Sequence, residues 1–404
     1  MPDIPVGAQV FDLAFHPNQS LVFAGLLTGI VKAFSYDEQG NHEEKFSVRP
    51  TKRSCRTLAV SADGSQLWAA GKAKAIHTID VETGEVVETR AAAHDVTINR
   101  MKRLQPHLLA SGDDDGVIKL WDPRKPDAVR KYTHHFDFIS DFMYLNDKKQ
   151  LVATSGDGTL SVMDIRSKKM EPVAQSEDQE DELLSILPIK GGQKIVVGTQ
   201  IGILSIFNRK SGWDDCVDRI PGHPASIDAL CAIPSRYPNS QSTILTGSSD
   251  GILRAVQLFP TKLLGVVADH GEFPIERIAV DMNGEGRWVG SVGHEEVLKL
   301  TDLQEIFEDG GEEDNDEDGG EGDEDADSDE EQTKQTTDPT TSAKVPTDDE
   351  SADEVDKGQV DSSDEEQPQP AKRKRKKEQD PLLAGRRKKG KNEVEAEPAF
   401  FADL

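Results

Sequence analysis

The chain has 404 residues and a formal net charge of −28, and the acidic residues are concentrated towards its C-terminus. Residues 308–404 contain 33 acidic and 14 basic residues, whereas residues 1–307 contain 42 acidic and 33 basic residues, an ordinary balance for a globular region. No apolar run approaches the roughly 18 residues of a membrane span, and the segment MPDIPVGAQV lacks the features of a secretory signal. Three widely spaced cysteines without a metal-binding pattern, Cys55, Cys216 and Cys231, indicate structural thiols in a reducing compartment.

Segments similar to GVIKLWD recur seven times and indicate an internal repeat. When the segments are aligned on Trp121, the equivalent positions lie 45, 42, 42, 44, 49 and 45 residues apart. This period is typical of the four-stranded blades of WD-repeat proteins. The sequence therefore predicts an all-β fold, a seven-bladed WD-repeat β-propeller formed by residues 1–307. The aligned positions, one in each blade, are Phe34, Ile79, Trp121, Met163, Phe207, Val256 and Thr301.

Each repeat also shows strand and turn signals in a constant order. The predicted inner strands include 10–15, 56–60, 139–144, 182–187, 226–230 and 276–280. Five repeats have a turn glycine five residues before the aligned position, where a positive φ angle favours glycine. The second repeat lacks this glycine, and the seventh has Glu296 in its place. We expect the short N-terminal segment 3–6 to pair with the seventh blade, because closure removes the exposed edges of the ring.

The stretch SGDDDGVIKLWDPR (111–124) contains three adjacent carboxylates and is the strongest candidate for a polar site. Its spacing lacks the alternation and distal Glu of a calcium loop, so we expect no metal and no cofactor. In this type of repeat a buried network joins a histidine, a strand serine or threonine, the turn aspartate and the tryptophan. The sequence therefore predicts contacts among His94, Ser111, Asp115 and Trp121. Asp113 and Asp114 are expected to be solvated charges of the loop. Asp157 and Asp250 occupy the same turn position in other repeats, His223 is a second histidine of this kind, and the pair His134 and His135 supplies another. Because no catalytic motif is found, we expect a protein that is not an enzyme.

Two sets of charged residues are candidates for binding a partner. Charged residues at equivalent inner-strand positions form a mixed ring that could bind a polar peptide or protein. The alternative is that each residue stays solvated around a water-filled channel. These residues are Asp12, Arg56, Arg100, Asp141, Asp228 and Arg277. Arg124 and Arg166 are the last residues of the segments WDPR (121–124) and MDIR (163–166). This pattern resembles the motif by which some WD-repeat proteins dock onto a cullin-RING ligase adaptor. The alternative is that arginine simply follows aspartate often at the end of this strand.

The remaining residues predict a disordered charged C-terminal tail in three parts. Residues 308–371 are acidic and rich in serine, with 16 acidic residues among the 24 of 308–331, so they bury too little apolar surface to fold. Residues 372–391 contain two basic blocks, which predict a bipartite nuclear or nucleolar targeting signal or, alternatively, contact with RNA. The basic residues are Lys372, Arg373, Lys374, Arg375, Lys376, Lys377, Arg386, Arg387, Lys388, Lys389 and Lys391. In residues 392–404 an apolar cluster predicts either a docking motif or a frayed end; it comprises Phe400, Phe401 and Leu404.

Taken together, GAQVFDLAFHP, SGDDDGVIKLWDPR, TSGDGTLSVMDIR, the KRKRKK block and the terminal FFADL resemble the nucleolar WD-repeat family of ribosome-biogenesis proteins. The resemblance covers nearly the whole chain. It implies a monomeric, non-catalytic scaffold in the nucleus and nucleolus that acts in precursor rRNA processing or large-subunit maturation. The implied partners are pre-ribosomal assembly factors or ribosomal proteins, and a nuclear import receptor, with no membrane. The alternative function is that of a substrate receptor in a cullin-RING ubiquitin ligase.

Overall fold

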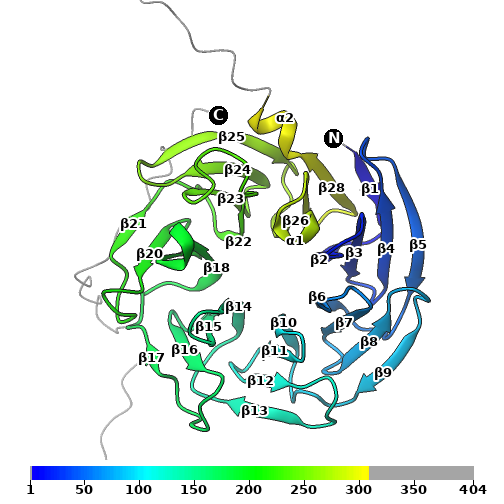
Figure 1. The fold of residues 1–404 in the computed structure, drawn as a ribbon, viewed down its shortest axis with the longest axis horizontal. Coiled ribbons are helices and arrows are strands. Elements are labelled where there is room, and N and C mark those ends of the chain that lie inside the picture. The colour runs from blue at the N-terminus through cyan, green and yellow to red at the C-terminus, as the bar shows by residue number, and fades with distance from the viewer. Residues whose placement is uncertain (1, 309–404) are drawn as a thin grey trace, which may run out of the picture. The chain divides into compact units, whose positions relative to one another are not determined.

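The computed structural model describes residues 2–308, which form seven four-stranded antiparallel sheets arranged as blades around a central axis (Figure 1). The predicted seven-bladed propeller is therefore confirmed. Within blades 1 to 6 the strands follow one another in sequence from the axis outwards. Blade 1 contains β2 (Val10–Phe15), β3 (Leu21–Leu26), β4 (Val31–Tyr36) and β5 (His42–Val48). Blade 2 contains β6 (Cys55–Val60), β7 (Gln66–Gly71), β8 (Ile76–Asp80) and β9 (Val86–Arg90). Blade 3 contains β10 (Ile98–Gln105), β11 (Leu108–Asp113), β12 (Ile118–Trp121) and β13 (Ala128–Tyr132).

The other four blades follow the same plan, with one exception at the ring closure. Blade 4 contains β14 (Ile139–Leu145), β15 (Gln150–Ser155), β16 (Leu160–Asp164) and β17 (Ala174–Gln175). Blade 5 contains β18 (Leu183–Ile189), β19 (Lys194–Thr199), β20 (Leu204–Asn208) and β21 (Asp218–Ile220). Blade 6 contains β22 (Ile227–Ala232), β23 (Thr243–Ser248), β24 (Ile252–Gln257) and β25 (Lys262–Asp269). Blade 7 contains β26 (Ile275–Val280), β27 (Trp288–Gly293), β28 (Val297–Asp302) and, as its outermost strand, β1 (Asp3–Pro5).

The ring is closed by the N-terminal strand, as the sequence predicted. β1 pairs antiparallel with β28, with Ile4 opposite Leu298, and the Ile4 side chain is fully buried. The Val6 amide also donates to the Glu296 carbonyl at 2.9 Å. Blade 7 therefore combines the two ends of the propeller, and the pairing covers the otherwise free edge of β28.

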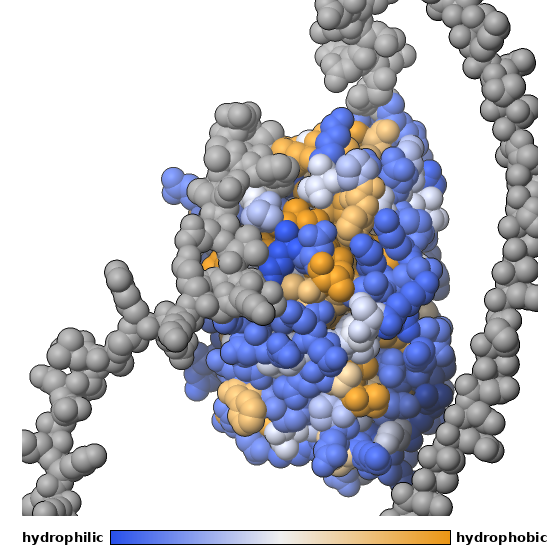
Figure 2. Space-filling model, turned by 90° about the vertical axis from the view of Figure 1, so that its left-hand side faces the viewer, coloured by the Kyte–Doolittle hydropathy of each residue, from blue (hydrophilic) through white to orange (hydrophobic). Residues whose placement is uncertain are grey.

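The hydrophobic core is divided into seven clusters, and each lies between two consecutive blades. The second strands, such as β3 and β23, are buried along their whole length because neighbouring blades cover both of their faces. Outer strands such as β9 are mostly exposed. Seen from the side, the ring is mainly hydrophilic with apolar side chains scattered among the polar ones (Figure 2). Since every cluster needs two blades, the stability of the ring depends on its closure.

The turn between the second and third strands of a blade requires a left-handed backbone. Gly116 has a φ of 76° in blade 3, and a Cβ atom there would lie 2.7 Å from the His135 carbonyl oxygen. In blade 2, which lacks the glycine, Lys74 adopts a φ of 62° in the same place. The non-glycine residue therefore accepts a strained conformation to keep the turn.

The antiparallel order of the strands gives the propeller two different faces. We call the face with the turns between second and third strands and the connections between blades the upper face. The lower face carries the loops from first to second strand and from third to fourth strand. Within residues 2–308 three short helices also occur: the 3-10 helix η1 (Lys190–Gly192), α1 (Asp281–Gly284) and α2 (Leu303–Phe307). Asp302 caps α2 by accepting from the Gln304 amide at 2.9 Å.

Candidate interaction surfaces

The carboxylates of blade 3 belong to a buried hydrogen-bond network. His94 Nδ1 lies 2.6 Å from Asp113 Oδ2, and His94 Nε2 lies 2.6 Å from Ser111 Oγ. The Trp121 indole N–H donates to the same Ser111 hydroxyl at 2.8 Å. All four side chains are buried, and burial lowers the pKa of His94. A neutral imidazole with its proton on Nδ1 satisfies every donor and acceptor in this chain.

The prediction that Asp115 completes this network is wrong, because Asp113 takes that place. Asp113 is the last residue of β11 and is two positions from Ser111, so both side chains face His94. Asp113 also accepts from the backbone amides of Asp115 and Val117, at 3.1 and 2.8 Å. Asp115 is exposed at the turn. The expectation that Asp113 is a solvated charge is therefore also wrong.

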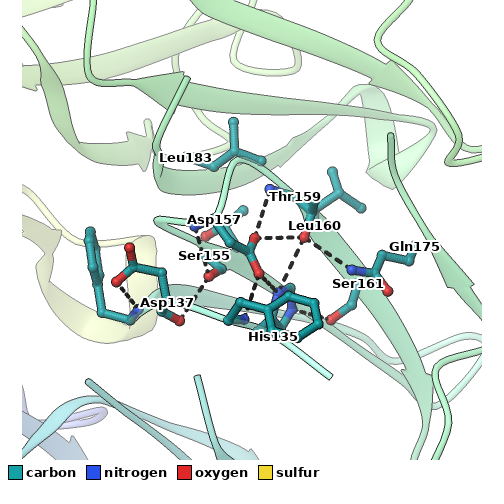
Figure 3. A network of polar contacts seen from close by, with 12 residues as sticks. His135, Asp137, Ser155, Asp157, Thr159, Leu160, Ser161, Gln175 and Leu183 are labelled. Carbon is teal, nitrogen blue, oxygen red and sulfur yellow. Dashed lines mark hydrogen bonds and ion pairs between the residues drawn. The ribbon is translucent and has the colours of Figure 1, made fainter. Parts of the chain in front are cut away.

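Blade 4 contains a second network, in which the aspartate of the turn does contact a histidine (Figure 3). His135 Nδ1 lies 2.9 Å from Asp157 Oδ2, and its Nε2 lies 2.7 Å from Ser161 Oγ. Asp157 also accepts from the Phe136 amide at 3.0 Å and from the Thr159 amide at 2.9 Å. The network thus connects the loop entering blade 4 to the strands β15 and β16 and holds the two in register.

Two further histidines are buried in blades 6 and 7. His223 Nε2 lies 2.9 Å from Thr246 Oγ1, and His270 Nε2 lies 2.7 Å from Ser291 Oγ. Burial lowers the pKa of His223 to about 3 and that of His270 to about 4. In blade 6 the turn residue Asp250 forms an ion pair with Arg254 at 2.6 Å. His223 and His270 therefore act as neutral, structural groups.

We expect His223 to make the stability of the propeller dependent on pH. Its pKa is lower in the folded chain than in the unfolded chain, so the stabilisation is complete above pH 6.5 and decreases as the pH falls towards 3. At pH 5 the loss should amount to about 1–2 kcal/mol. The His223→Gln variant should lose less stability than the wild type between pH 7 and pH 5 in denaturant titrations. The exposed His107→Gln variant is the control, and equal losses for His223→Gln and the wild type would contradict the assignment.

The charged residues predicted at the inner strands fall into two groups. Four of them meet across the axis: Arg100 Nε donates to Asp141 Oδ1 at 2.8 Å, and Arg277 Nε lies 3.2 Å from Asp12 Oδ1. Arg100 also lies 3.8 Å from Asp12, and Arg277 lies 4.0 Å from Asp141. Both carboxylates are buried, and burial raises the pKa of Asp12 to about 6 although Arg100 opposes the shift. These four side chains connect blades 1, 3, 4 and 7 to one another.

The other two inner-strand residues lie outside this cluster. Arg56 donates to Asn99 Oδ1 at 2.7 Å and lies 3.6 Å from Asp114. Asp228 accepts from the hydroxyls of Ser226 and Ser249 at 2.9 and 2.7 Å, and burial raises its pKa. The structure therefore does not bring the six residues together as one open ring. Their role in binding a partner stays a prediction.

Arg124 and Arg166 lie on the lower face in neighbouring blades. The Arg124 guanidinium donates to both oxygens of Asp122, each at 2.9 Å, and its side chain is 64% exposed. Arg166 makes the same bidentate contact with Asp164, at 3.0 and 2.8 Å, and is 65% exposed. Both guanidinium groups are thus held by an aspartate of their own loop while one edge of each remains open to solvent. Their use in docking stays a prediction.

Sequence reasoning missed the clefts on the lower face, because each is lined by residues from different blades. A cleft of about 520 Å³ between blades 4, 5 and 6 is lined by residues that include Tyr144, Lys190, Arg209 and Gln241. A second, of about 420 Å³, lies between blades 2 and 3 and includes Arg124 in its wall. Both clefts adjoin loops with many polar residues and are accessible to a partner.

Within residues 2–308 no group of three or more His, Cys, Asp or Glu side chains is arranged to hold a metal ion. No helix in this part of the chain is long and apolar enough to cross a membrane. The predicted targeting residues from Lys372 to Lys391 lie outside the described residues. The predicted docking residues Phe400, Phe401 and Leu404 lie outside them as well.

The fold and the repeated polar networks define a WD-repeat propeller, a class of protein-interaction scaffolds that are generally not catalytic. Comparison with known proteins narrows the class, since the WDR55 family profile matches residues 1–306. The chain is 64% identical over 310 residues to WD repeat-containing protein JIP5 of Coprinopsis cinerea, covering 76% of this chain and 75% of that protein. It is 36% identical over 305 residues to WD repeat-containing protein 55 of Bos taurus, covering 75% and 77%. The chain belongs to the WDR55 family.

Proposed function

We propose that the protein is a non-catalytic scaffold of the nucleolus that acts in ribosome biogenesis, in precursor rRNA processing or large-subunit maturation. The observation that carries the proposal is membership of the WDR55 family over residues 1–306, combined with the two dense basic blocks within residues 372–391. The buried histidine networks support a scaffold, because their polar groups bond to one another and leave no activated nucleophile or base exposed.

Purification of the tagged full chain tests this proposal. We expect pre-ribosomal assembly factors, ribosomal proteins and precursor rRNA to dominate the material that co-purifies. We also expect depletion of the protein to change the ratio of precursor to mature large-subunit rRNA. If a cullin adaptor dominates instead, and rRNA precursors are absent and unaffected by depletion, the proposed function is wrong.

The second candidate is a substrate receptor of a cullin-RING ubiquitin ligase, favoured by the exposed Arg124 and Arg166 on adjacent blades. Against it, each guanidinium already makes a bidentate contact with its own aspartate, which partly neutralises its charge. The double variant Arg124→Ala and Arg166→Ala should retain the pre-ribosomal proteins that co-purify with the wild type. Selective loss of a cullin adaptor from this variant, with Lys125→Ala as the control, would favour the second candidate.

We expect the basic blocks of residues 372–391 to act mainly as a nuclear or nucleolar targeting signal. Neutralising their 11 positive charges should leave the protein in the cytoplasm, because an import receptor recognises closely spaced cations. Fusing an unrelated import signal to this variant should restore nuclear location and ribosome production, measured by fluorescence microscopy and polysome profiles. A fusion that enters the nucleus and fails to support ribosome production would indicate that the blocks contact RNA or another partner.

A further inference from the structure

Four loops on the lower face each contain two adjacent cations. They follow or precede strands of blades 3, 4 and 5, and the antiparallel order of those strands places all four loops at the same face. Lys190, in η1, adds a further cation beside the last of them. We call this set the lower basic strip; its pairs are Arg124 and Lys125, Lys148 and Lys149, Lys168 and Lys169, and Arg209 and Lys210.

Contacts join the loops of the lower basic strip in blades 4 and 5. The Ile165 amide donates to the Lys149 carbonyl at 3.2 Å, which joins the two loops of blade 4. Arg209 of blade 5 forms an ion pair with Asp147 of blade 4 at 2.8 Å. On the other side, Arg130 of blade 3 donates to the Arg166 carbonyl at 3.5 Å. The cations of blades 4 and 5 therefore lie on connected loops, and blade 3 adjoins them through Arg130.

The arginines and lysines of the strip differ in how they are neutralised. Arg124 and Arg209 of the strip each have an aspartate partner nearby, as does Arg166 in the same loop as Lys168 and Lys169. The lysines at the loop tips have no carboxylate within ion-pair distance among residues 2–308, and all are exposed; they are Lys125, Lys148, Lys168, Lys169, Lys190 and Lys210. The Lys190 ammonium lies 4.4 Å from the centre of the Phe259 ring, and the other five ammonium groups are available to an anionic partner.

The upper face of the same blades has the opposite charge. The turns and connections of blades 3 to 5 on this face contain no lysine or arginine; they are residues 91–97, 114–117, 133–138, 156–159, 176–182 and 200–203. The loop 176–182 alone has five carboxylates. Glu182 is close to Asp137 and Asp181; burial raises the pKa of Glu182, and these two carboxylates raise it further. On blades 3 to 5 a polyanion is therefore repelled by the upper face and attracted by the lower face.

We propose that the lower basic strip binds the phosphate backbone of RNA. The lysines are spread over three blades, and their point charges suit the repeated phosphates of a nucleic acid better than a short acidic peptide. The cleft of about 520 Å³ at the end of the strip has Lys190 and Arg209 in its wall and a half-buried Tyr144, which offers space for an unstacked base. The identity of this RNA as a ribosomal precursor rests on the proposed function; the binding itself does not.

The test uses the full chain and a short hairpin RNA, with affinity measured at several salt concentrations. The variant Lys148→Gln, Lys168→Gln and Lys169→Gln removes three cations from the strip. The control Lys52→Gln, Arg53→Gln and Lys72→Gln removes three exposed cations from the upper face. We expect the first variant to bind about 10- to 100-fold more weakly and its salt dependence to decrease by about two in log–log slope. The control should behave as the wild type.

Chemical acetylation of the wild-type chain with and without the hairpin provides a second measurement. RNA should protect Lys148, Lys168, Lys169 and Lys190 and leave Lys52 and Lys72 unchanged. Equal affinities of the two variants, or protection confined to lysines outside the strip, would overturn the proposal, as would capture by the strip of an acidic protein in place of RNA. Co-purification of pre-ribosomal proteins, measured separately, reports on the proposed function even if RNA binding by the strip fails.

Discussion

Asp113→Ala should destabilise the propeller by about 3–5 kcal/mol, which is an unusually large cost for one residue of an acidic loop. The substitution removes a buried carboxylate and leaves the His94 Nδ1–H without an acceptor. It also removes the acceptor of the backbone amides of Asp115 and Val117, which both donate to Asp113. A buried donor without a partner costs about 1–3 kcal/mol, and this applies to His94, while the two part-buried amides add a smaller loss.

The neighbouring carboxylate is the matched control for this prediction. Asp115→Ala has the same chemistry two residues away, but its side chain is exposed, and its denaturation midpoint should equal that of the wild type. Asp113→Asn separates charge from hydrogen bonding, because an amide oxygen can still accept from the histidine. We expect it to fall between the wild type and Asp113→Ala. Equal midpoints for Asp113→Ala and Asp115→Ala would show that the blade 3 network does not stabilise the fold.

Deleting residues 1–9 should lower the melting temperature by about 10 °C, since the ring loses its closing strand. The deletion removes Ile4, Val6 and Ala8, which are buried in the cluster between blades 7 and 1. Loss of a buried isoleucine or its equivalent costs roughly 2–5 kcal/mol, and the free edge of β28 adds to that cost. For a protein of this size, 1 kcal/mol corresponds to about 2–4 °C. Thermal unfolding followed by circular dichroism measures the change.

Point variants of the same strand show whether the effect comes from packing. Ile4→Ala should reproduce a large part of the loss, because the side chain is fully buried. Asp3→Ala, at an exposed position of the same strand, should melt as the wild type does. An unchanged melting temperature after the deletion would mean that β1 does not hold the ring closed.

The amino-acid sequence by itself determined the architecture of this protein. Hydrogen bonds within a blade join strands that are adjacent in the chain, so each blade leaves a complete local signature of strand, turn and strand. Seven signatures at a nearly constant spacing predicted seven blades, and the short apolar segment before the first strand predicted the closure. The histidine of blade 4 and its turn aspartate also followed the repeat pattern.

Only the tertiary structure decided which polar side chains meet. The choice of Asp113 over Asp115 depends on which residue shares a strand face with Ser111, and a repeat pattern aligned on the turn does not reveal that. The contacts of Arg277 with Asp12 and Asp141 join residues from three blades, because the curvature of the ring brings distant strands to one axis. The lower basic strip has the same origin. Its lysines are distant in sequence and become neighbours because every blade turns its loops to the same face.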